Sequence, residues 1–179
     1  MVGGTSYTAP LTIKMDPRVK TTISGLQQQF DLEMKITDAM RTDYAAVQQV
    51  RSVRTQLKDL AAKAAKGTLA QTISNLDKKL AELEGKNGGF GAQFLSTPEG
   101  RSLVRLNSGL NSLLGVVDSA DTAPTTQAIS TFAEVQQALD QQLSNWQEIK
   151  TKDIVATNSE LRKAGLSPIN VESRTGGAK

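Results

Sequence analysis

The chain has 179 residues, of which 38% are hydrophobic and only 4% aromatic, and it carries 21 basic against 18 acidic side chains. This length fits one domain, or one domain with a fragment of another. Because the chain lacks both cysteine and histidine, disulfides, zinc–thiolate sites and histidine-based catalysis are excluded. The net charge of +3 is spread thinly, which argues against a protein dedicated to nucleic acid or anionic membranes.

Residues 7–18, "YTAPLTIKMDPR", alternate between apolar and polar side chains and end at Asp16-Pro17. This period of two predicts a β-strand, and Pro10 favours an edge position or a bulge. A single strand cannot satisfy its own backbone, and no second strand follows. The strand therefore needs neighbouring strands that the rest of the sequence does not predict.

Residues 24–66 are predicted to form one long amphipathic helix, with capping-box spacing between Ser24 and Gln27 and closure at Gly67. The apolar residues that define its predicted buried face recur mostly at three- and four-residue steps: Leu26, Phe30, Met40, Tyr44, Val47, Val50, Leu57, Leu60 and Ala64.

A second helix is predicted from Thr68 to Gly85, and Thr68 with Gln71 repeats the capping spacing. Its apolar residues have coiled-coil spacing: Leu69, Ile73, Leu76, Leu80 and Leu83. A glycine-rich loop at residues 85–97 follows. Such a loop is functional, or its Phe90 and Phe94 plug one end of the bundle, which is the interpretation we favour.

The third helix is predicted to open at Thr97-Pro98. Its apolar stripe is Leu103, Leu106, Leu110, Leu113 and Val117. The fourth starts near Pro124 and runs towards Leu161, and the stripe along it is Phe132, Val135, Leu139, Leu143, Trp146 and Ile149. Gly165, with Leu166 placed five residues after Leu161, predicts a Schellman ending. The segment 167–171 is expected to be extended and 172–179 a flexible tail.

The predicted fold class is all-α: an antiparallel up-down-up-down helical bundle of two long and two short helices over residues 19–171, preceded by one β-strand. A competing arrangement stacks the second and third helices end to end in a three-helix rod. Contact between Leu161 and Phe30 would favour the first arrangement, and contact between Leu161 and the Gly67 turn would favour the second.

No catalytic, cofactor-binding or metal-binding residue is assigned. Gly85-Lys86 fails the phosphate-loop pattern, and Gly89-Phe90-Gly91 fails the dinucleotide fingerprint. The carboxylates considered for acid–base chemistry are interpreted as solvated, with the last two serving helix ends: Asp31, Glu33, Asp38, Asp118 and Asp121.

The densest basic stretch is interpreted as a solvated helix face because no aromatic side chain is interleaved with it. It comprises Arg51, Arg54, Lys58, Lys63 and Lys66. Trp146 and Tyr44 are interpreted as core anchors, with a ligand groove as the alternative. No segment reaches the ~18 apolar residues of a membrane span. The N-terminus lacks signal-peptide character, so the protein is cytoplasmic or an export signal lies upstream.

Three stretches, "SYTAPLTIKMDPRVKTT", "LQQQFDLEMKITDAM" and "VRSVRTQLKDL", carry a resemblance to a known family. They resemble the C-terminal region of secreted bacterial sortilin-like or BNR (Asp-box) β-propeller proteins, often labelled glycosyl-hydrolase-like. In that family a sandwich strand ends in an Asp-Pro-Arg motif, here Asp16 to Arg18, and the chain closes near Gly165 to Ile169. The propeller signature itself is absent. The resemblance implies that residues 1–18 are the terminal strand of a preceding sandwich-like domain that is absent from this chain.

The resemblance implies a non-catalytic structural or interaction module at the C-terminal end of a larger secreted protein, extracellular or periplasmic. Its expected partners are neighbouring domains or another protein, without nucleic acid or membrane insertion, and an oligomer is possible. The alternative is a free-standing partner-binding helical bundle, adhesin- or chaperone-like, with an apolar groove along the Trp146 half of the fourth helix. A carboxylate-based hydrolase is the third hypothesis.

Overall fold

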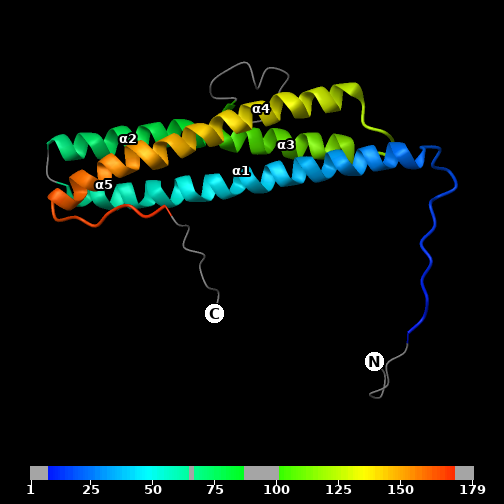
Figure 1. Ribbon diagram of the computed structural model, residues 1–179, viewed down its shortest axis with the longest axis horizontal. Coiled ribbons are helices and arrows are strands. Elements are labelled where there is room, and N and C mark those ends of the chain that lie inside the picture. The colour runs from blue at the N-terminus through cyan, green and yellow to red at the C-terminus, as the bar shows by residue number, and fades with distance from the viewer. Residues whose placement is uncertain (1–7, 65–66, 87–100, 172–179) are drawn as a thin grey trace.

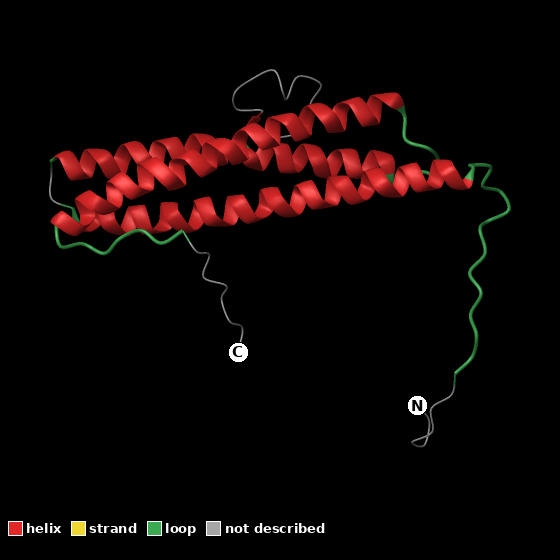
Figure 2. Cartoon of the chain, viewed as in Figure 1, coloured by secondary structure: helices red, strands yellow, loops and turns green. Residues whose placement is uncertain are grey.

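The structure, a computed structural model, describes residues 8–64, 67–86 and 101–171, and within these ranges every regular element is a helix (Figure 2). The elements are α1 (Ile23–Lys63), α2 (Thr68–Glu84), α3 (Leu103–Val117), α4 (Thr126–Glu148), the π-helical segment η3 (Ile149–Asp153) and α5 (Ile154–Lys163). The prediction of an all-α helical bundle is confirmed.

The helices form a long rod (Figure 1), in which α1 packs against α2 and α3, and the run from α4 to α5 packs against the same helices. α1 runs the whole length, while α2 and α3 lie one after the other along it, both antiparallel to α1. The continuous run of α4, η3 and α5 returns over both. Of the two predicted arrangements, the structure has the end-to-end stack. Leu161 is fully buried near the α2 end of the rod, whereas Phe30 is 55% exposed at the other end.

The core of the rod is formed by the apolar faces of the helices, which pack against one another along its axis. On α1 the buried positions follow alternating four- and three-residue steps, which keeps one seam facing its neighbours. They are Gly25, Gln29, Leu32, Ile36, Ala39, Asp43, Ala46, Val50, Val53, Leu57 and Leu60, and Val47 is buried beside this series. The stripe predicted for the first half of α1 was wrong by one position, because Gly25, Gln29 and Asp43 take core positions while Phe30 and Tyr44 face solvent.

The predicted N-terminal strand is not seen in residues 8–22, which are mostly exposed and belong to no helix or strand. The physical reason is the one anticipated from the sequence: within the described residues no sheet exists for this segment to join. Residues 1–7 lie outside the described part, as do the tail at 172–179 and the proposed plug residues Phe90 and Phe94.

Helix ends differ from the predicted caps. Thr22, not Ser24, caps α1, and its Oγ1 accepts a hydrogen bond from the Gly25 N–H at 3.1 Å. α2 is preceded by Gly67 and has no side-chain cap. α3 begins after Ser102, and the predicted opening at Thr97-Pro98 lies outside the described residues. At α4, Thr125 accepts from the Ala128 N–H at 3.1 Å.

A π-helical segment joins α4 to α5 without a break in direction. The buried residues of this run are Ala128, Val135, Leu139, Trp146, Ile149, Ile154, Thr157 and Leu161. The step from Ile149 to Ile154 is five residues instead of three or four, and a π-turn absorbs one extra residue. The buried face therefore continues through α5. The predicted Schellman ending is confirmed by the Leu166 N–H bond to the Leu161 carbonyl at 2.9 Å.

After α5 the chain folds back along the rod as an extended strap, residues 166–171. Asn158 pairs with both backbone groups of Ile169, accepting from N–H at 2.7 Å and donating to the carbonyl at 3.0 Å. Gln56 of α1 does the same with Asn170, at 2.9 and 2.7 Å. Since Ile169 is also buried, the strap fastens α5 to α1.

Candidate interaction surfaces

The N-terminal segment, residues 8–15, projects from the end of the rod where α1 begins (Figure 1). Its apolar side chains are open to solvent: Leu11 is 86%, Ile13 89% and Met15 58% exposed. Its backbone makes no hydrogen bond to any other described residue. Extended backbone with unpaired N–H and C=O groups is the form in which a strand adds to the edge of another sheet.

A local turn connects this segment to the rod. The Asp16 carboxylate accepts from the Arg18 backbone N–H at 2.9 Å and from the Arg18 guanidinium at 2.7 Å. The hydrogen bonds to Arg18 lower the pKa of this exposed carboxyl. The Val19 N–H closes the turn on the Asp16 carbonyl at 3.0 Å, and Thr21 Oγ1 donates to the Asp121 carbonyl. The predicted Asp-Pro-Arg motif is thus a self-contained turn.

Exposed apolar side chains gather at the same end of the rod. Ten large hydrophobic residues are exposed in the described chain, and eight of them lie in the N-terminal segment or at this end. The five on the rod, which we call the apolar end, are Ile23, Phe30, Met34, Val116 and Ile129. These five side chains share one end of the rod but lie on three different helices, so each face of this end offers exposed apolar area to a partner.

A groove of about 650 Å³ opens between the first halves of α1 and α4 at this end. Leu32, Ile129 and Phe132 form its apolar floor, and Asp31 with Lys35 stand on its α1 side. This groove lies on the opposite half of α4 from the Trp146 groove expected from the sequence.

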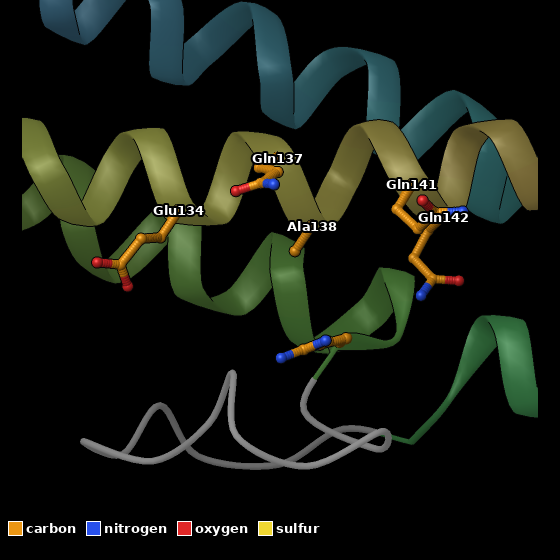
Figure 3. A pocket seen from close by; sticks show the side chains of 6 residues that line it. Glu134, Gln137, Ala138, Gln141 and Gln142 are labelled. Atoms are coloured by element: carbon orange, nitrogen blue, oxygen red, sulfur yellow. The ribbon is translucent and has the colours of Figure 1, made fainter.

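A second groove, of about 400 Å³, follows α4 beside the start of α3 (Figure 3). Glu134, Ala138 and Gln142 project from α4 towards it, and Arg101 also lines it. The other described residues of its lining are Gln137 and Gln141. Among these described residues there is no pair of carboxylates that could divide acid and base roles.

The predicted carboxylate candidates stay apart from one another. Asp31 and Asp38 are exposed on α1, where they accept from Gln27 and Arg41 at 2.8 and 2.9 Å. Half-buried Glu33 has one enclosed oxygen without a hydrogen-bond partner. Asp118 is the C-cap of α3 and Asp121 takes the Thr21 hydrogen bond. The expectation that these last two serve helix ends holds for the position of Asp118 but not for Asp121, which accepts through its backbone carbonyl, while Thr125 caps α4.

The basic stretch divides into two groups. Lys58 and Lys63 are exposed, while Arg51 and Arg54 reach across to α2 and bind Glu84 at 2.7 and 2.6 Å. Arg54 also donates to Asp77 at 2.9 Å. The two arginines are thus structural ion-pair partners of α2 and not a free cationic face. Lys66 lies outside the described residues.

The two aromatic residues predicted to be core anchors differ in burial. Trp146 is buried, its indole N–H donates to Gln49 Oε1 at 2.9 Å, and the Lys150 ammonium lies 5.5 Å from the centre of its ring. It is a core anchor, as predicted. Tyr44 is 60% exposed and is not one.

Asp43 is a buried polar residue that was not recognised as a core position from the sequence. It is fully buried on the α1 seam, and neither carboxylate oxygen has a hydrogen-bond partner among the described residues. Burial raises its pKa to about 7, an effect that the nearby Asn107 amide only partly opposes. Counting alternate four- and three-residue steps from Leu60 back along α1 would have placed Asp43 in the core.

Comparisons with protein family models, curated proteins and solved structures found no significant match to this chain. Within residues 8–64, 67–86 and 101–171 no helix is both long and apolar enough to cross a membrane. The same ranges contain no group of three or more acidic side chains placed to hold a metal ion.

Proposed function

We propose that this chain is a non-catalytic interaction module that attaches its helical rod to a β-rich body by strand addition. Residues 8–15 supply the added strand, and the body is a sheet-bearing neighbouring domain or partner chain. The observation that carries the proposal is the N-terminal segment itself, which alternates exposed apolar and polar side chains while its backbone pairs with no described residue. The family resemblance, to the end of a secreted β-propeller protein, points to the same kind of body.

The apolar end supports this proposal through its position. Residues 16–22 separate the segment from α1, a span of at most about 25 Å. A body that holds residues 8–15 in its sheet therefore lies within reach of Ile23, Phe30 and Ile129. Burying these side chains and the groove beside them would add apolar contact area to the main-chain pairing.

Hydrogen exchange tests the proposal on the isolated 179-residue chain and on the complete protein, by which we mean this chain together with the sheet-bearing body that it is proposed to join, whether as one polypeptide or as a complex. The amides of residues 8–15 should exchange as fast as an unstructured peptide in the isolated chain, and much more slowly in the complete protein. The variant Ile13→Lys should abolish that protection, whereas Val155→Lys, an exposed position on α5 far from the apolar end, should leave it intact. Fast exchange of residues 8–15 in the complete protein would contradict strand addition.

A free-standing partner-binding bundle is the second candidate, and the groove between α1 and α4 is the observation that favours it. An amphipathic helix laid into such a groove is a common recognition mode. Saturable, partner-dependent protection of Leu32 and Phe132 together with continued fast exchange of residues 8–15 would favour this candidate. Hydrolysis of a glycoside by the isolated chain, lost on changing one carboxylate, would contradict both.

A further inference from the structure

Asp43 occupies a core position of α1, where the neighbouring buried side chains are mostly apolar. It continues the unbroken seam of α1 between Ala39 and Ala46, both buried. The residue is completely enclosed, at 0% exposure. It lies on the part of α1 that packs against the start of α3, since Asn107 of α3 donates to the carbonyl of Met40, one turn earlier, at 3.3 Å.

The carboxyl group of Asp43 has little compensation for this burial, because the only described group that stabilises its charged form is the nearby Asn107 amide, which does so incompletely. Both of its oxygens are enclosed without a hydrogen-bond partner among the described residues. Glu84, the other buried acidic residue, is 8% exposed, but it accepts from Arg51 at 2.7 Å and from Arg54 at 2.6 Å. An enclosed carboxylate without such partners is strongly unfavourable, and a protonated carboxyl is much less so.

Among the described residues, no charged side chain is a cause of the raised pKa of Asp43. On α1 the nearest acidic residue, Asp38, is paired with Arg41 at the surface. The nearest charged residues along α3 and α4 are Arg105 and Asp140, and neither contributes to the pKa of Asp43. That pKa is set by burial, with the neutral Asn107 acting in the opposite direction.

We propose that Asp43 is a proton-dependent lock on the middle of the rod. With the carboxyl protonated, α1 packs closed against α3. Ionisation opens this contact and lets water reach the carboxylate. The rod is therefore more tightly closed in mildly acidic than in mildly alkaline conditions. This inference does not depend on the proposed function, because it concerns the rod alone.

The test uses the full chain at pH values from 5 to 8.5. The ¹³C shift of the Asp43 side-chain carboxyl is followed by NMR, and amide exchange of α1 is corrected for the intrinsic effect of pH. We expect the carboxyl to titrate near neutrality. We also expect the open population around residues 39–47 to rise by up to about tenfold per pH unit below that midpoint. Asp43→Leu should remove this rise, and Asp38→Asn, a surface aspartate on the same helix, should retain it.

Each outcome decides the proposal. A midpoint near that of an ordinary aspartate would overturn it, and this measurement needs no variant. A rise in the open population that persists in Asp43→Leu would also overturn it, because another group would then be responsible. Titration near neutrality together with a pH-independent Asp43→Leu rod supports the lock.

Discussion

Gly85 lies directly against Ser102, although the two residues belong to opposite ends of the interval that separates α2 from α3. A Cβ atom placed on Gly85 would collide with the Ser102 side chain, and the Gly85 backbone has φ of +73°. The end of α2 and the start of α3 thus abut, which is why these two helices stack along α1 and do not lie side by side.

Gly85→Ala should destabilise the rod by about 1–3 kcal/mol, because the new methyl group meets Ser102 and the backbone conformation disfavours any side chain. Urea unfolding followed by circular dichroism measures the change. The matched control is Gly115→Ala, an exposed position inside α3 with no atom near the added Cβ. That variant should be stabilised by about 0.5–1 kcal/mol. Equal effects at both positions would contradict the close contact.

Glu84→Ala should cost about 3 kcal/mol, since it leaves Arg51 and half-buried Arg54 without their shared carboxylate. Lys152→Ala breaks the exposed pair with Glu148, in which the side chains are 73% and 58% exposed, and should leave the urea midpoint nearly unchanged because solvent screens such a pair. The comparison is made by urea unfolding at neutral pH. A loss at Glu84 as small as that at Lys152 would show that the ion pairs add nothing to the α1–α2 contact.

The two buried acidic residues should give opposite pH dependences. Burial favours a higher pKa at Glu84, but the hydrogen bonds from Arg51 and Arg54 hold it below its usual value of 4.5. Its contribution to stability is therefore present above pH 4.5 and is lost as pH falls through the lowered value. Glu84→Gln should flatten the acid limb of the stability profile.

For Asp43 the folded-state pKa of about 7 exceeds the unfolded value of 3.8. The folded state therefore holds the extra proton, and stability decreases as pH rises between these values, by at most about 4 kcal/mol in total. Asp43→Asn should remove this decrease. Unfolding free energies are measured from pH 3 to 9 on the unmodified chain, Glu84→Gln and Asp43→Asn. The comparison separates the loss of stability at acid pH from the loss of stability as pH rises towards 7. An unchanged profile in either variant would contradict the corresponding assignment.

The strap should detach when its amide partners are removed. Gln56→Ala and Asn158→Ala each delete two hydrogen bonds to the backbone of the strap, and each should lower its local opening free energy by about 1–2 kcal/mol. Exchange of the Ile169 and Asn170 amides reports the opening. Gln71→Ala, which removes only a surface bond to Asn75, is the control. Protection of Ile169 in the double variant would mean that burial alone holds the strap.

A helix of this fold could be predicted from the sequence where its core positions are occupied by large apolar residues, and less well where they are not. α2 and α3 could be placed because their core positions are almost all leucine, isoleucine or valine. α1 could be recognised as a long helix, but its register was off by one over its first half. There Gln29 can be buried because its side-chain amide donates to the Val117 and Ala120 carbonyls, at 2.9 and 3.1 Å. These hydrogen bonds to residues distant in sequence offset the cost of burying the amide, and no local sequence pattern reveals them.

The candidate surfaces show the same limit. The alternation in residues 8–15 and the lack of a second strand could be found from the sequence, whereas the exposure of their side chains could only be seen in the structure. Phe30 was assigned to the core because it is large and apolar, yet it lies on the outer face of α1. A hydrophobicity pattern does not distinguish a seam that faces the molecule's own core from one that faces solvent.

The π-helical segment has a consequence for which insertions and deletions the rod tolerates. Each residue removed from an α-helix rotates everything beyond it by about 100°. A one-residue deletion within Ile149–Asp153 would convert the π-turn into an ordinary one and leave Leu161 on the same side as Trp146. The same deletion in the middle of α1 would turn half of its seam away from α2. The π-helical segment is therefore the place in the rod where a one-residue deletion should disturb helix packing least.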